Sequence, residues 1–420
     1  MSNPRNSSAP IAQIRHDVSG EREWMLGGAV IIKVMLDGTA VPVEREVFDA
    51  LFSQSVVDDR APVRAARLES TIPFRTFVEL ARTAQIPYPL FFAPLDVVEE
   101  QLRIKTEKLM VGFTKDFFSM NSRNRVHLPD VELIVKDLLR KQQHVKADKT
   151  LRRNAIVGAL KRPGSSVAED AAKLMRALDF TTDDLKAAKT KESALELLIT
   201  KLEARQVLVA RSAKNYMPQQ MPKRAKFSGM TIRDAKVPFI FLASGDEGEN
   251  LEPSGRKMFT LTLLAVLIAR GTFAPVTYDG HTTDETSPRE YELTAEILMP
   301  EVELRQADLG SLPAIREAAD TYKVTPSAVV MRTRRLGLCD RETAAAYLEA
   351  LAAEYANRAN SPKRSPLAIN ALRKYNGTEC SRRMLGLLDA GHINRADFCR
   401  VMFSNKLKPA QINDYRAAVA

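Results

Sequence analysis

Residues that could bind a metal or move a proton are sparse in this chain. Its five histidines are nowhere three or four positions apart, so no two can share one helical face around a zinc ion. One group does combine suitable types, namely His281, Asp284, Glu285 and Glu290. It indicates either an unusual metal or catalytic site or a solvated polar loop, and we favour the loop.

The three cysteines, Cys339, Cys380 and Cys399, form no C-x-x-C pair. Such an odd, sparse set predicts neither a disulfide framework nor a cysteine-rich zinc site, and it fits a reducing cytoplasm, where we expect the protein to reside. The longest apolar run, residues 261–269, is about half as long as a membrane span needs to be. We therefore expect no contact with a membrane.

Basic residues outnumber acidic ones, which gives the 420 residues a formal net charge of +10. This excess favours contact with polyanions or acidic partners. We predict seven nucleic-acid contacts, three on one predicted helix and four in a basic stretch: Arg332, Arg334, Arg335, Arg152, Arg153, Lys161 and Arg162. The alternative interpretation is that both segments pack within the protein and point their arginines toward solvent.

The spacing of apolar residues predicts an α+β fold that is mainly helical, with helical N-terminal and middle regions. We expect helices over residues 76–84, 97–118, 129–143, 149–160, 167–178, 192–205, 256–269, 290–299, 312–322, 327–336 and 341–355, and more from 366 onward. Clusters of β-branched and aromatic residues predict strands over 206–210 and 236–242. The class of residues 21–65 stays open.

These elements divide the chain into about three modules and their connections, as its length suggests. We expect a disordered tail (1–20), an N-terminal domain (21–95), a helical region (96–190), a module with a short sheet (191–310), a helix-turn-helix-like pair (311–356) and a C-terminal helical region (357–420).

Several segments carry a family resemblance in the right order. They are Leu202-Glu-Ala-Arg-Gln-Val-Leu-Val-Ala210 with Phe227-Ser-Gly229, then Arg256-Lys-Met-Phe-Thr-Leu261, then Leu293-Thr-Ala-Glu-Ile-Leu-Met-Pro300. Together they resemble the ImmA/IrrE family of zincin-type metallopeptidases. Residues 322–338 are similar to the helix-turn-helix that follows this module in the family. Residues 68–94 resemble the tail of an XRE-type repressor domain, with Leu68 and Thr71 replacing its Trp and Gly.

The resemblance also identifies what is missing. The family's active-site helix carries H-E-x-x-H, in which two histidines hold zinc and the glutamate activates water. The matching positions here are Leu263, Leu264 and Leu267, and the third ligand falls near Arg289, next to Glu290. The resemblance therefore implies no catalytic residues, no bound metal and no cofactor.

We accordingly expect a catalytically inactive, peptidase-like regulatory protein of a mobile-element, toxin–antitoxin or phage-related system. Its expected partner is a repressor- or antitoxin-type protein, and DNA is a further expected partner. Two alternatives stay open: a DNA-binding transcriptional regulator, and a zinc metallopeptidase with a non-standard site. The oligomeric state does not follow from the residues.

Overall fold

The computed structural model describes residues 13–16, 22–26, 29–115, 118–119, 126–220, 227–243, 252–277, 288–357 and 367–420. The chain forms two compact units, one of residues 1–110 with 127–133 and one of residues 111–126 with 134–420. Over the described residues the fold is α+β and mainly helical, as the sequence predicts. Among the described helices, none is long and apolar enough to cross a membrane.

The N-terminal unit is built on a sheet. Strands β1 (Gln13–His16), β2 (Arg22–Leu26), β3 (Ala29–Leu36) and β4 (Thr39–Glu44) pair antiparallel in that order, and β5 (Thr71–Pro73) lies parallel to β3. Asp37 and Gly38, at φ 48° and 82°, form the two-residue turn between β3 and β4. The expectation of a helical N-terminal region holds for residues 45–110 only in part, and within 21–65, whose class the sequence left open, the β-branched run 29–36 forms a central strand.

Helices of the same unit pack against this sheet. They are α1 (Arg45–Ser53), α2 (Ala61–Glu69), α3 (Phe74–Thr83) and α4 (Leu95–Met110), with the 3-10 helix η1 (Tyr88–Phe92) between the last two. The rings of Phe52 and Phe77 contact that of Phe91 at centroid distances of 4.7 and 4.8 Å, inside a core that also holds Ile32 and Val34. The helix expected at 76–84 is confirmed as α3.

The larger unit contains a second five-stranded sheet, in the order β6 (Phe118–Ser119), β10 (Pro275–Thr277), β8 (Phe227–Ile232), β9 (Phe239–Leu242) and β7 (Leu208–Arg211). β8 runs antiparallel to both of its neighbours, whereas β7 is parallel to β9 and β6 is parallel to β10. The strands expected at 206–210 and 236–242 are confirmed as β7 and β9.

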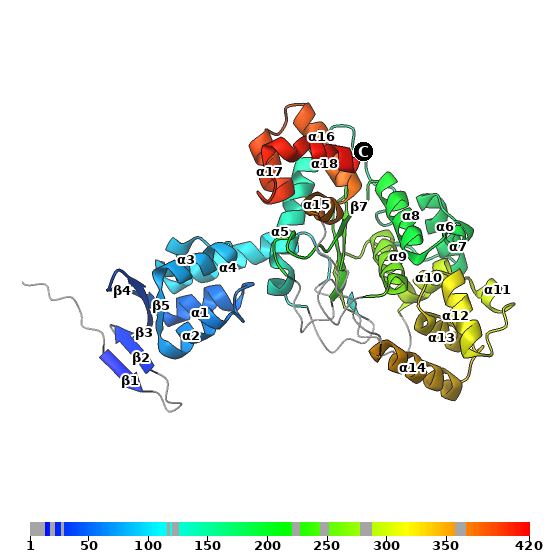
Figure 1. Ribbon diagram of the computed structural model, residues 1–420, viewed down its shortest axis with the longest axis horizontal. Helices are drawn as coiled ribbons and strands as arrows, with labels where there is room; N and C mark the ends of the chain where they lie inside the picture. The colour runs from blue at the N-terminus through cyan, green and yellow to red at the C-terminus, as the bar shows by residue number, and fades with distance from the viewer. Residues whose placement is uncertain are drawn as a thin grey trace, which may run out of the picture. The chain divides into compact units, whose positions relative to one another are not determined.

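The core of this unit lies between the sheet and a group of helices (Figure 1). They are α6 (Val167–Leu178), α7 (Thr182–Ala187), α8 (Lys191–Ala204), α9 (Ser254–Arg270), α10 (Arg289–Leu298), α11 (Glu301–Leu304), α12 (Leu312–Thr321), α13 (Pro326–Arg335) and α14 (Arg341–Ala356). The side chain of Ser166 caps α6 by accepting from the N–H of Glu169. The expected helices of this region are confirmed, apart from 149–160.

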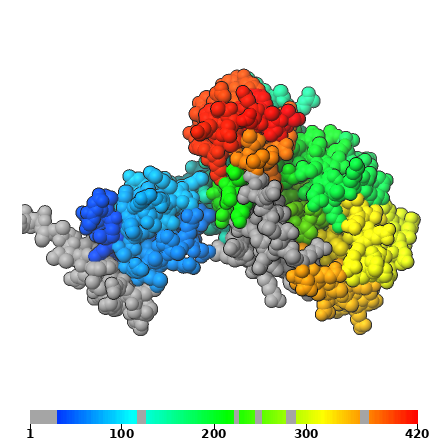
Figure 2. Space-filling view, viewed as in Figure 1, coloured from blue at the N-terminus to red at the C-terminus, as the bar shows by residue number. Residues whose placement is uncertain are grey.

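The C-terminal helices close the β7 edge of the sheet. α15 (Ala368–Asn376) and α16 (Thr378–Asp389) contact β7, and α17 (Arg395–Phe403) and α18 (Ile412–Val419) complete the cluster. Covering an edge strand in this way removes a surface on which another chain could add a strand. Figure 2 shows these helices, orange to red, against green residues of the same unit.

Candidate functional site

α9 carries the three leucines at which the sequence resemblance predicts a lost metal site. Gly255 brings its first turn against the connection between α12 and α13, since a Cβ there would lie 2.4 Å from the carbonyl carbon of Val324. Gly229 of β8 allows an equally close approach, because a Cβ there would lie 2.9 Å from Leu264 Cδ1. Gly271, at φ 74°, ends the helix. These contacts hold α9 between β8 and the helical layer.

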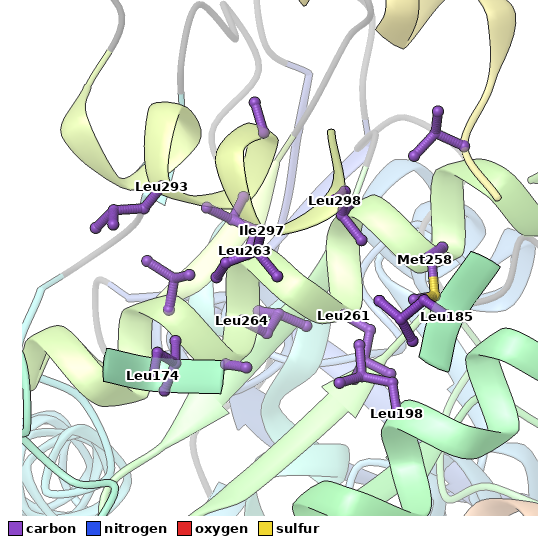
Figure 3. Packing of buried hydrophobic residues seen from close by; sticks show 14 of the residues in the cluster. Leu174, Leu185, Leu198, Met258, Leu261, Leu263, Leu264, Leu293, Ile297 and Leu298 are labelled. Atoms are coloured by element: carbon purple, nitrogen blue, oxygen red, sulfur yellow. The ribbon is translucent and has the colours of Figure 1, made fainter. Parts of the chain in front are cut away.

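The three leucines at the predicted ligand and base positions are part of the hydrophobic core. Leu263 is 2% exposed, and Leu264 and Leu267 are 0% exposed. In Figure 3, Leu263 lies toward Leu293 and Ile297 of α10, which belong to the same core cluster. Aliphatic carbon has no lone pair for zinc and no proton to exchange, so this face of α9 cannot perform metal-dependent hydrolysis.

The position of the third ligand is occupied by ion pairs. Glu290 Oε1 lies 3.5 Å from Arg270 Nε, and the adjacent Arg289 donates to Asp170 Oδ2 at 2.9 Å and to the carbonyl of Gly164 at 3.3 Å. Each carboxylate thus faces a guanidinium, which leaves little negative charge for a cation. Within the described ranges, no group of three or more His, Cys, Asp and Glu residues could hold a metal ion.

The structure does not describe the rest of the alternative site. His281, Asp284 and Glu285 fall in 278–287, outside the described residues. Of the four residues proposed for it, the structure describes Glu290, whose carboxylate pairs with Arg270. The zinc peptidase with a non-standard site therefore stays a prediction without support from the described geometry.

The arginines of α13 do not form one basic face. Arg332 is 7% exposed and forms an ion pair with Glu296 of α10, on the face that also buries Val329, Val330 and Thr333. Arg334 is partly buried and Arg335 is exposed. The prediction that Arg332 contacts nucleic acid is wrong, because the side chain is used to join α13 to α10.

The four basic residues of the middle region do not lie on a helix. Residues 151–162 form turns instead of the expected helix at 149–160, since Gly158, at φ 74°, and Leu160 donate to the carbonyls of Ile268 and Ala269 at the end of α9. The Ile268 carbonyl also accepts the N–H of Gly271 at 2.9 Å, so the contact from Gly158 is a second bond to it. The contact from Leu160 satisfies the Ala269 carbonyl, one of the last carbonyls of α9. The side chains of Arg152, Arg153, Lys161 and Arg162 are all exposed.

A buried ionic cluster that the sequence did not indicate lies on α5 (Leu128–Val145). Lys141 is 1% exposed and its Nζ lies 2.6 Å from Asp137 Oδ2. Tyr375 of α15 donates its hydroxyl to the same oxygen at 2.8 Å, and Lys141 Nζ lies 4.2 Å from the centre of its ring. Periodicity alone assigns Lys141 to the solvated face of α5, and that assignment is wrong because α15, more than 200 residues later, covers it.

Two further contacts attach α16 to the sheet side of the unit. Glu203, at the end of α8, accepts the backbone N–H of Glu379, and Arg383 donates to Asp148 at 2.6 Å. Burial raises the pKa of Glu203 to about 7, and the N–H groups of Glu379 and Val209 oppose this only in part. The nearby Cys380 is fully buried and its pKa is raised to about 12, so it is not a reactive thiolate.

Comparisons with protein-family models, with curated proteins and with solved structures return no significant match.

Proposed function

We propose that this protein is a non-hydrolytic relative of the ImmA/IrrE peptidases that acts by binding a repressor- or antitoxin-type protein. The observation that carries the proposal is the burial of Leu263, Leu264 and Leu267 on α9, between motifs that resemble the family on either side. Without metal ligands at these three positions, α9 cannot activate water. It is still suited to support a binding surface as part of the packed core.

The alternative functions have less support. A DNA-reading α13 would need its arginines on one free face, but Arg332 is buried against Glu296. A zinc peptidase would need ligands that converge, and Glu290 instead pairs with Arg270. Binding without catalysis requires neither arrangement.

Metal analysis of the purified full chain tests the loss of chemistry. We expect far less than one zinc per chain after incubation with excess zinc and desalting, and the same result for Glu290→Gln. One zinc per chain, together with chelator-sensitive cleavage of a repressor-type protein, would overturn the proposal and support the non-standard peptidase.

Co-expression tests the binding role. The full chain is produced with the repressor- or antitoxin-type protein encoded beside it, and the mixture is separated by size exclusion with mass determination. We expect one complex of fixed stoichiometry in which the partner keeps its full mass. Separate elution of the two proteins, or a shortened partner, would contradict the proposal.

A further inference from the structure

Three segments far apart in the sequence meet at one place on the larger unit. The side-chain amide of Asn154 donates to the carbonyls of Arg205 and Lys236 at 2.8 and 3.4 Å, and its backbone N–H donates to Ala235 at 2.9 Å. The amide of Gln206 donates to the carbonyls of Arg152 and Lys236 at 2.8 and 3.0 Å. Two buried or half-buried amides thus hold the backbones of 152–154, 205–206 and 235–236 together.

Each of the three segments brings exposed positive charge. Arg152, Arg153, Arg205 and Lys236 are exposed, and we call them the basic cluster. Among the described residues, none of these four side chains forms an ion pair. Exposed Lys149 precedes Arg152 on the same segment. Like charges held this close repel one another, so the arrangement favours an anionic ligand.

The acidic residues of these segments do not neutralise the cluster. Asp148 pairs with Arg383 of α16 at 2.6 Å, and Asp234 pairs with Lys146 at 2.6 Å. Asp234 also accepts the N–H groups of Lys236 and Val237 at 2.7 and 3.0 Å. Both carboxylates are therefore engaged with other partners and leave the positive charge of the cluster uncompensated.

The chemistry around the cluster favours one class of anion. Within the described residues, the large apolar side chains that are exposed all lie outside residues 146–154, 204–207 and 233–237, and these stretches contain no aromatic residue. A protein interface would need an apolar or aromatic anchor, and single-stranded nucleic acid would need rings on which bases stack. A duplex backbone needs cations alone.

We propose that the basic cluster binds the phosphodiester backbone of duplex nucleic acid without regard to sequence. Arg152, Arg153, Arg205 and Lys236 contact phosphates, while Asn154 and Gln206 position the segments that carry them. These contacts and charges do not involve the leucines of α9, so duplex binding can be tested independently of the proposed peptidase-like role.

Fluorescence anisotropy with a labelled 24-base-pair DNA of random sequence tests the proposal on the full chain. Four phosphate contacts predict a slope of log K against log salt of about −3.6, and hence roughly a 100-fold loss of affinity between about 50 and 200 mM salt. We expect weaker binding to the single strand and to polyglutamate. No binding at about 50 mM salt, or polyglutamate binding as tight as duplex, would overturn the proposal.

Charge reversal locates the site. Arg152→Glu with Arg153→Glu should lower duplex affinity at least about tenfold and reduce the salt slope by about 2. Lys236→Glu, in a different segment, should weaken binding in the same direction. The matched control is Lys173→Glu with Lys189→Glu, two equally exposed lysines outside the predicted nucleic-acid contacts. Lys189 precedes α8 at the end opposite to Arg205.

The control decides between a site and a general charge effect. We expect the Lys173 and Lys189 reversal to change affinity less than about threefold, through long-range electrostatics alone. Equal losses from the two double variants would overturn the proposal, as would no loss from Lys236→Glu. Circular dichroism of each variant should show that the fold is kept, because the substituted side chains are exposed.

Discussion

The helices α9 and α5 differ in the side chains that they bury. α9 resembles a metal-binding helix, yet Leu263, Leu264 and Leu267 bury apolar carbon between β8 and α10. α5 has the pattern of an ordinary amphipathic helix, yet it holds the buried pair of Asp137 and Lys141. A buried ion pair therefore lies where α5 meets α15, whereas α9 holds no charge at these three positions.

Whether a helix face is buried or exposed to solvent depends on which distant segments cover it. Both helices were predictable from apolar spacing, because one face of each enters a core. The opposite face of α5 is buried by Tyr375, whose position depends on contacts between distant segments. A buried pair of this kind is stable only while each charge keeps its partner, whereas the leucines of α9 depend on close packing alone.

Leu264→Glu is expected to give the largest effect. It places a carboxylate at a position that is 0% exposed, touches Gly229 and lies inside the apolar core cluster of the described residues. We expect the free energy of unfolding to fall by at least about 4 kcal/mol. Leu264→Met is the control of similar volume and should cost less than about 1.5 kcal/mol. Equal denaturation midpoints for the two variants would show that this face of α9 is open to water.

Lys141→Met tests the other half of the comparison. The change leaves the Asp137 carboxylate buried with the Tyr375 hydroxyl as its remaining partner, so we expect a loss of about 3 to 5 kcal/mol in chemical denaturation. The control is Arg75→Met, which breaks the exposed pair of the same spacing with Glu79 and should leave stability unchanged. A loss no larger than that of the control would mean that the α5 pair is solvated in solution.

Some features of this fold could be predicted from the sequence and others could not. Most helices and the strands at 206–210 and 236–242 followed from the spacing of apolar and β-branched residues, because this signal is local. The turn at 151–162 was predicted to be a helix, since its apolar spacing gave no sign that Gly158 and Leu160 would bond to the end of α9. The burial of Arg332 and the meeting of Arg152, Arg205 and Lys236 depend in the same way on partners 30 or more residues away.

Glu203 predicts a pH dependence of stability. Its pKa in the folded protein is about 7, above the ordinary value near 4.5, so the folded state binds the proton more tightly. The stabilisation is fully present below about pH 4.5 and is lost as pH rises through 7. Relative to Glu203→Gln, the free energy of unfolding of the wild type should fall by about 3 kcal/mol over this window. The pKa is about 7 in the folded protein and near 4.5 ordinarily, and a difference of one in pKa corresponds to about 1.36 kcal/mol. Parallel pH profiles of denaturation midpoints for the two proteins would contradict it.

Glu290→Gln should give the smallest effect. It tests whether the ion pair of α10 contributes as little to stability as its partial exposure predicts, in contrast to the buried pair of α5. Glu290 faces Arg270 across 3.5 Å with both side chains near one-sixth exposed, so losing the charge should cost less than about 1 kcal/mol. Asp170→Asn is the matched comparison, because Asp170 is 2% exposed and receives both Arg289 and the N–H of Gly164. We expect that change to cost about 2 kcal/mol by weakening charge-assisted hydrogen bonds in a dry site. A larger loss from Glu290→Gln than from Asp170→Asn would reverse this order, and would identify Glu290 as the carboxylate whose charge this region requires.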